Sequence, residues 1–70
     1  VNAVSPGFTL TELTRKTNTT EELEVIQSKI PMQRLADPSE IASLVAYLCS
    51  DMNSYCTGQN ITIDGGYTNL

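Results

Sequence analysis

The sequence contains no histidine and no tryptophan, and it has only two cysteines, Cys49 and Cys56. The spacing of these cysteines matches neither a zinc-binding pattern nor a redox Cys-x-x-Cys pair. Without histidine, and with its acidic residues dispersed, the chain offers no recognisable metal site. We therefore expect two reduced thiols and no bound metal.

Basic residues are also scarce, because four Lys and Arg stand against eight Asp and Glu, for a formal net charge of −4. The four bases are scattered at Arg15, Lys16, Lys29 and Arg34. Neither a nucleic acid nor an anionic membrane is therefore an expected partner. No apolar run approaches the roughly 20 residues that a membrane span requires. The composition favours a soluble, acidic protein of the cytoplasm.

Two strands are predicted near the ends of the chain. Residues 1–4 are small or β-branched, and Pro6 is expected to end this strand because it has no N–H for the ladder. Residues 59–63 alternate polar and β-branched side chains, which predicts a strand with Ile61 and Ile63 facing inward. Strands joined through helices are expected to be parallel, with a right-handed crossover.

Two helix starts carry capping boxes, in which the cap residue and the residue three positions later each accept from the other's backbone N–H. Thr19 and Glu22 form the first box, and Pro31 is expected to end that helix. Asp37 and Glu40 form the second box, with Pro38 at the first helical position. The second helix carries an apolar stripe at helical spacing: Ile41, Leu44, Val45, Leu48 and Cys49.

A chain of this length would be marginally stable as a domain, because folding would bury only about 60% of the surface that the unfolded chain exposes. Parallel strands also need cover on both faces, which the predicted helices do not supply. The opening VNAVSPGF resembles the second half of a buried strand that runs into a turn. We therefore expect the α/β chain to be the end of a larger sheet, not a complete domain.

Three motifs, in order along the chain, resemble the short-chain dehydrogenase/reductase family. The first has the form N-x-V/I-x-P-G-x-x-x-T and reads NAVSPGFTLT here. The second is similar to the family's last long helix and its approach, and reads RLADPSEIASLVAYLCSD. The third resembles the final strand and its Asp-Gly-Gly turn, and reads SYCTGQNITIDGG. The resemblance covers essentially the whole chain.

The resemblance implies the C-terminal part of a Rossmann-type doubly wound parallel sheet, with residues 1–70 as a fragment of one domain. Its expected parts are a strand and Pro-Gly turn (1–7), a substrate lid (8–31), the last long helix (37–51) and the last strand (58–64). The remaining part of the domain is then a required partner.

The resemblance also implies a cofactor site for NAD or NADP beyond the carboxyl end of the first strand. Pro6 and Gly7 would form a wall beside the nicotinamide ring. The backbone at Thr9 would meet the carboxamide, and the Thr11 hydroxyl would reach the carboxamide or the pyrophosphate. The alternative interpretations are an ordinary strand-ending turn for Pro6-Gly7, and a solvated loop threonine or a helix cap for Thr11.

No residue of the chain matches the family's catalytic Tyr-x-x-x-Lys pair, its serine or its asparagine, so no catalytic residue is assigned. The resemblance implies part of an enzyme that transfers hydride between nicotinamide and an alcohol or ketone, and we expect the 70 residues alone to be inactive. Reductases of 3-oxoacyl-carrier-protein, and after them sugar or polyol dehydrogenases, are the relatives that it suggests. The substrate and the choice between NAD and NADP are left open.

The last helix and strand resemble the segments that join subunits in this family, which implies a homodimer or homotetramer. Tyr67 and Leu70 would extend toward the neighbouring subunit. An alternative is a non-catalytic dimerisation or binding module derived from the same fold.

Overall fold

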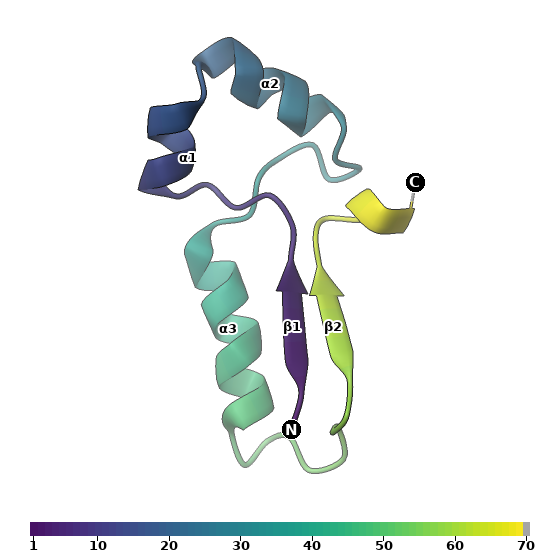
Figure 1. Ribbon diagram of the computed structural model, residues 1–70. Coiled ribbons are helices and arrows are strands. Elements are labelled where there is room, and N and C mark those ends of the chain that lie inside the picture. The colour runs from purple at the N-terminus through teal and green to yellow at the C-terminus, as the bar shows by residue number, and fades with distance from the viewer. Residues whose placement is uncertain (70) are drawn as a thin grey trace.

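The computed structural model describes residues 1–69, and Leu70, expected near a neighbouring subunit, lies outside them. Figure 1 shows two strands side by side, one helix alongside them and two short helices beyond their carboxyl ends. In chain order the elements are β1 (Ala3–Pro6), α1 (Glu12–Thr17), α2 (Thr20–Ser28), α3 (Pro38–Cys49), β2 (Asn60–Ile63) and the 3-10 helix η1 (Tyr67–Asn69).

The two strands are parallel, as predicted, with Ala3 opposite Asn60. As predicted, β1 ends at Pro6, but the strand begins at Ala3 and not at Val1, and Pro6 itself still pairs, opposite Ile63. The N–H groups of Ala3 and Gly7 donate toward the β2 side, at 2.8 and 3.0 Å. Because the backbone N–H groups of successive strand residues point to opposite edges of the strand, the nitrogen of Pro6 faces away from β2. Its missing N–H therefore removes no hydrogen bond from this pair.

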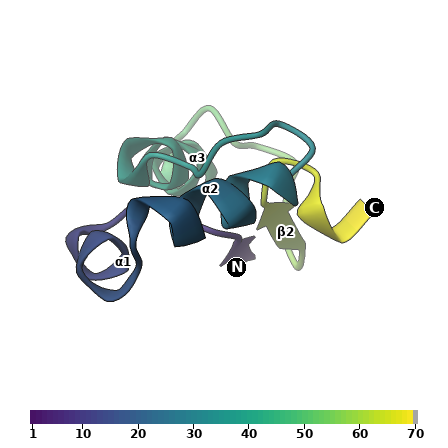
Figure 2. The same ribbon diagram turned by 90° about the horizontal axis from the view of Figure 1, so that it is seen from above.

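The connection from β1 to β2 is left-handed, whereas a right-handed crossover was expected. In Figure 1 both strands point upward with β2 to the right of β1, and the view from above in Figure 2 places α3 behind them. The usual right-handed preference arises when a helix packs directly back onto the sheet. Here the chain first forms α1 and α2 beyond the strand ends, so the connection is not such a simple unit.

Both predicted capping boxes are present. The Glu22 N–H donates to the Thr19 hydroxyl at 3.1 Å, and the Thr19 N–H donates to the Glu22 carboxylate at 3.2 Å. At α3 the Asp37 carboxylate accepts from the Ser39 N–H at 2.9 Å. The Asp37 N–H in turn donates to Glu40 Oε1 at 2.9 Å. These reciprocal bonds fix where α2 and α3 begin.

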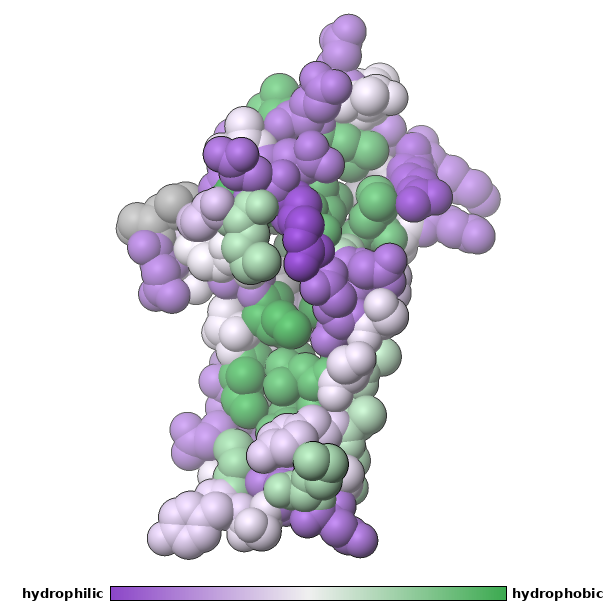
Figure 3. All heavy atoms as spheres, turned by 180° about the vertical axis from the view of Figure 1, so that it is seen from behind, coloured by the Kyte–Doolittle hydropathy of each residue, from purple (hydrophilic) through white to green (hydrophobic). Residues whose placement is uncertain are grey.

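The buried core of the described residues consists of Ile30 and Leu35, which are 3% and 7% exposed. Pro31 was expected to end the helix that Thr19 caps, but α2 ends at Ser28, so Ile30 lies beyond this helix. The α3 stripe is half-buried or exposed, and Figure 3 shows apolar side chains open on the face where this helix lies. So small a core agrees with the prediction of a partial α/β sheet.

The carboxyl ends of the two strands touch at Gly7. A Cβ on Gly7 would lie 2.6 Å from the Cβ of Asp64 and 3.0 Å from its Cα, so no side chain fits there. The next residue along from Asp64 is Gly65, with φ of +64°, where a Cβ would meet Cγ2 of Ile30 at 2.9 Å. Glycine at position 7 is thus required by the packing of the strand ends themselves.

We predict that Gly7→Ala in the full-length protein lowers the free energy of unfolding by about 1–3 kcal/mol, because the added methyl overpacks against backbone. Equilibrium denaturation measures this loss. Gly58→Asn is the matched control: φ at Gly58 is +73° with nothing within 4 Å, and asparagine tolerates that conformation. A Gly7→Ala protein as stable as the wild type would contradict the close contact with Asp64.

Candidate functional site

The residues predicted to contact a cofactor follow one another from the carboxyl end of β1. Pro6 and Gly7 line a hollow of about 410 Å³. Thr9 and Thr11 do not line it, so the structure divides the predicted site into a strand-end part and a loop part. The other residues around the hollow come from both strands and from the segment that ends in η1: Ser5, Phe8, Thr62, Asp64, Tyr67 and Thr68.

An aromatic pair closes one side of this hollow. The rings of Phe8 and Tyr67 meet edge to face, with centroids 5.3 Å apart. The Asp64 carboxylate accepts from the N–H groups of Gly66 and Thr68, each at 3.0 Å, and thereby holds the turn into η1. Hydrogen bonds from Thr68 lower the pKa of the Asp64 carboxyl. Sequence analysis assigned Tyr67 to a subunit contact and Phe8 to a substrate pocket, and it did not link the two rings, because the residues lie far apart along the chain.

The loop part of the site lies against the segment that precedes α3. The Ala36 N–H donates to the Phe8 carbonyl at 3.0 Å, and the Leu10 N–H donates to the Ala36 carbonyl at 2.9 Å. Thr9 thereby forms a short parallel bridge with Ala36. No sequence pattern signalled this contact, because it joins two loops that are far apart along the chain.

Thr9 has one free backbone donor. Its carbonyl oxygen accepts from the Thr11 N–H and from the Thr14 hydroxyl, each at 3.1 Å. Its side-chain hydroxyl donates to the Gly7 carbonyl at 3.2 Å. Its N–H finds no acceptor among residues 1–69. A ligand oxygen beside this loop can therefore take that N–H without displacing a protein group.

Thr11 caps α1, as the alternative interpretation had it. Its hydroxyl oxygen accepts from the Thr14 N–H at 3.2 Å and lies 3.0 Å from the Thr14 hydroxyl. Since the Thr14 hydroxyl donates to the Thr9 carbonyl, Thr11 is the donor between the two hydroxyls. The Thr11 proton is thus engaged, whereas one lone pair remains able to accept from a ligand.

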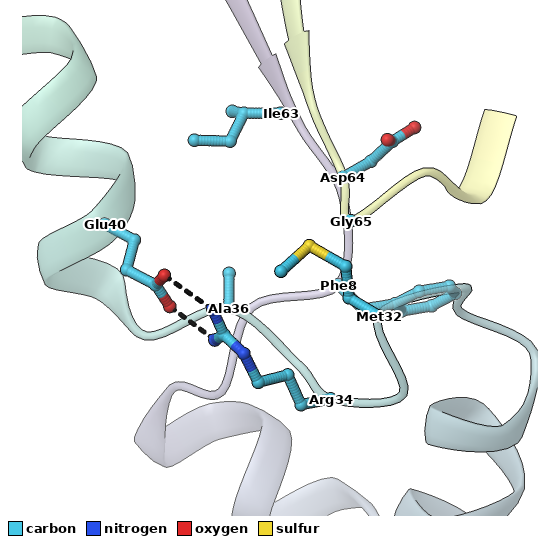
Figure 4. A pocket seen from close by; sticks show the side chains of 8 residues that line it. All are labelled: Phe8, Met32, Arg34, Ala36, Glu40, Ile63, Asp64 and Gly65. Carbon is cyan, nitrogen blue, oxygen red and sulfur yellow. Dashed lines mark hydrogen bonds and ion pairs between the residues drawn. The ribbon is translucent and has the colours of Figure 1, made fainter. Parts of the chain in front are cut away.

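Arg34 and Glu40, which flank Ala36 in the sequence, form an ion pair with two contacts. Arg34 Nη1 and Nη2 lie 2.7 and 2.8 Å from the two carboxylate oxygens of Glu40, drawn as dashed lines in Figure 4. From the sequence, Arg34 was expected to pair with an acidic neighbour or with backbone carbonyls, and both contacts are present, since Nη1 also donates to the Leu35 carbonyl at 3.4 Å. The guanidinium hydrogen bonds, followed by the bond from the Asp37 N–H, lower the pKa of Glu40 to about 2.

We predict that the Glu40 carboxyl titrates near pH 2 in the folded protein, well below its ordinary value of 4.5. Because the folded pKa is depressed, the stabilisation from this carboxylate is complete above pH 4.5 and is lost as the pH falls through 2. The chemical shift of its side-chain carboxyl carbon, followed against pH by NMR, measures this value. A midpoint near 4.5 in the wild type would contradict the ion pair.

Other site types find little support in the part of the chain that the structure describes. Residues 1–69 contain no group of three or more His, Cys, Asp or Glu that could hold a metal ion. Both cysteines are free, as predicted. None of the helices described is long and apolar enough to cross a membrane.

Comparison with known proteins gives matches over nearly the whole chain. A family model described as enoyl-(acyl carrier protein) reductase matches residues 1–68. D-arabinitol 2-dehydrogenase (ribulose-forming) from Scheffersomyces stipitis is 49% identical over 70 residues, which cover 96% of this chain and 25% of that protein. The 3-oxoacyl-(acyl-carrier-protein) reductase from Rickettsia felis is 46% identical over 66 residues, or 94% of this chain and 27% of that protein. The chain spans about a quarter of these relatives.

Solved structures share the same backbone arrangement. A short chain dehydrogenase family protein from Francisella tularensis superposes with a TM-score of 0.92 at 38% identity, covering 100% of this chain and 33% of that one. ElxO, solved with NADP bound, gives a TM-score of 0.88 at 35% identity, covering 100% of this chain and 29% of that one. The left-handed β1-α3-β2 unit, together with α1 and α2, thus corresponds to about a third of each of these two chains.

Proposed function

The chain belongs to the short-chain dehydrogenase/reductase family, and from this premise we propose that it forms the nicotinamide side of an NAD(P)-dependent oxidoreductase. The reaction proposed is hydride transfer between the nicotinamide and an alcohol or ketone. Because the chain carries no Tyr-x-x-x-Lys pair, the catalytic tyrosine, lysine, serine and asparagine would come from the rest of the protein. The 70 residues alone would then be inactive.

The free N–H of Thr9 is the observation that carries this proposal. A carboxamide has one oxygen that accepts and one NH2 group that donates. In the proposed contact the carboxamide oxygen accepts from the Thr9 N–H, and its NH2 donates to the remaining lone pair of the Thr11 hydroxyl. Donation by Thr11 to a pyrophosphate would instead break its bond to Thr14, so the carboxamide is the favoured partner.

Pro6 and Gly7 would supply the wall beside the ring. Pro6 is exposed at the carboxyl end of β1, where doubly wound sheets bind their ligands. Gly7 contributes only backbone, since the direction of its missing side chain is filled by Asp64. A flat ring can therefore lie against this segment without meeting a flexible side chain.

Residues 8–31 would act as the substrate lid. The helices α1 and α2 contain no buried residue and lie beyond the strand ends in Figure 1. Leu13 and Val25 are 70% and 54% exposed, which leaves apolar surface for a bound substrate or the rest of the domain to cover. Closing such a lid would exclude water during hydride transfer.

We further propose a homodimer or homotetramer that forms through α3 and β2. Val45 and Tyr47 on α3 are 42% and 46% exposed, and such apolar side chains favour a protein contact. A cytoplasmic location is the compartment that the two free thiols favour. The relatives act on a polyol and on an oxoacyl group at similar identity, so the proposed substrate stays at the level of an alcohol or ketone.

We predict that Thr11→Val in the full-length protein weakens NADH or NADPH binding about fivefold, the effect of one lost hydrogen bond. The 3-acetylpyridine analogue of the same cofactor carries a methyl in place of the NH2, so its affinity is expected to change little. Titration of cofactor fluorescence or calorimetry measures both affinities.

Thr11→Ser is the matched control, because serine retains the hydroxyl and caps a helix as well. It is expected to bind both cofactors like the wild type. An equal loss for the carboxamide and acetyl forms in Thr11→Val would show that only the α1 cap was damaged. A wild-type protein that binds neither NADH nor NADPH would contradict the proposed function.

A further inference from the structure

The direction of the Thr9 N–H is set by Ala36. The Phe8 carbonyl belongs to the same peptide group as the Thr9 N–H, and in a planar trans peptide these two bonds point in opposite directions. The Ala36 N–H holds that carbonyl at 3.0 Å. The Leu10 N–H holds the next peptide through the Ala36 carbonyl at 2.9 Å. The Thr9 donor therefore points away from Ala36.

Ala36 is itself fixed by its neighbours on both sides. Leu35 is 7% exposed and forms part of the small core. Asp37 caps α3, and its N–H donates to Glu40 Oε1 at 2.9 Å. The same Glu40 oxygen accepts from Arg34 Nη1 at 2.7 Å. One carboxylate thus holds both ends of the segment 34–37 against the first turn of α3.

The contribution of Arg34 is geometric. The side chains of Arg34 and Glu40 are 50% and 40% exposed, and ion pairs so exposed to solvent contribute little to stability. The planar guanidinium nevertheless contacts both carboxylate oxygens, which fixes orientation as well as distance. A lysine would provide a single point of contact. Figure 4 shows this fork beside Ala36, with Phe8 in the same group of side chains.

We propose that Arg34 is a positioning residue for the nicotinamide carboxamide: its fork to Glu40 fixes Ala36, and Ala36 aims the N–H of Thr9. This inference rests on the proposed function, because it takes the carboxamide as the acceptor. It adds a residue that neither touches the ligand nor belongs to the Pro-Gly motif. It also explains why an exposed ion pair lies directly behind the cofactor loop.

The test compares two ligands in the full-length protein and in its Arg34→Gln variant. NADH or NADPH carries the carboxamide, whereas ADP-ribose, or its 2′-phosphate for an NADP enzyme, keeps the adenosine, pyrophosphate and second ribose without nicotinamide. Arg34→Gln is expected to lower the affinity for the reduced cofactor about tenfold and the affinity for ADP-ribose less than about twofold. The affinity of Arg34→Lys for the reduced cofactor is expected to lie between those of the wild type and Arg34→Gln, since lysine restores one of the two contacts with Glu40.

Leu48→Ala, at the other end of α3, is the matched control for general destabilisation. It is expected to lower the melting temperature and leave the ratio of the two affinities unchanged. If Arg34→Gln does not fold, Glu40→Gln replaces it, because that amide still accepts from the Asp37 N–H.

Equal losses for both ligands, or no loss for either, would overturn the inference. A wild-type protein that binds the reduced cofactor no better than ADP-ribose would contradict the proposed carboxamide contact itself. That result concerns the wild type alone, so it is distinguishable from a failure confined to the Arg34 variants.

Discussion

The contact between Gly7 and Asp64 is the constraint on which the rest of the structure depends. It joins the carboxyl ends of β1 and β2 so closely that a side chain at position 7 would overlap the Cβ of Asp64. Asp64 then directs the chain into the turn that follows, through the bonds its carboxylate accepts. The Gly65 carbonyl in that turn accepts from the Met32 N–H at 3.2 Å, which brings the segment that follows α2 back to the strands. One close approach therefore places the strand ends, the final turn and the segment after α2 together.

The loop of residues 8–11 depends on a second set of contacts, which connects it to α3. Ala36 lies between the loop and the helix, and it is bonded to the peptides on both sides of Thr9. Glu40 connects the same segment to the α3 cap. A free donor at Thr9 is thus the product of three segments that are separate in the sequence. Its orientation is fixed by the protein's own contacts, and in the proposed carboxamide contact this would reduce the ordering cost of binding.

Sequence analysis succeeded where the rules are local. The capping boxes at Thr19 and Asp37 follow from residues three positions apart, and the alternation in β2 follows from side-chain period alone. The family was identified from motifs for the same reason, whereas no turn forms at Pro6-Gly7, because Pro6 belongs to β1. The ion pair of Arg34 was anticipated only as far as an acidic partner, without the fork geometry.

The features that sequence analysis missed are those decided by tertiary contacts. Whether Pro6 remains in the strand depends on which edge its nitrogen faces, and that requires the register with β2. The left-handed crossover depends on the route through α1 and α2, for which the general preference offers no guide. The bridge between Thr9 and Ala36, and the edge-to-face pair of Phe8 with Tyr67, join residues with no signal between them.

A crystal structure of the full-length protein with bound NAD or NADP tests the central claim most directly. The account predicts that the carboxamide oxygen lies within hydrogen-bonding distance of the Thr9 N–H, with the ring against Pro6 and Gly7. A nicotinamide bound away from this loop, or a Thr9 N–H bonded to another part of the protein, would contradict it.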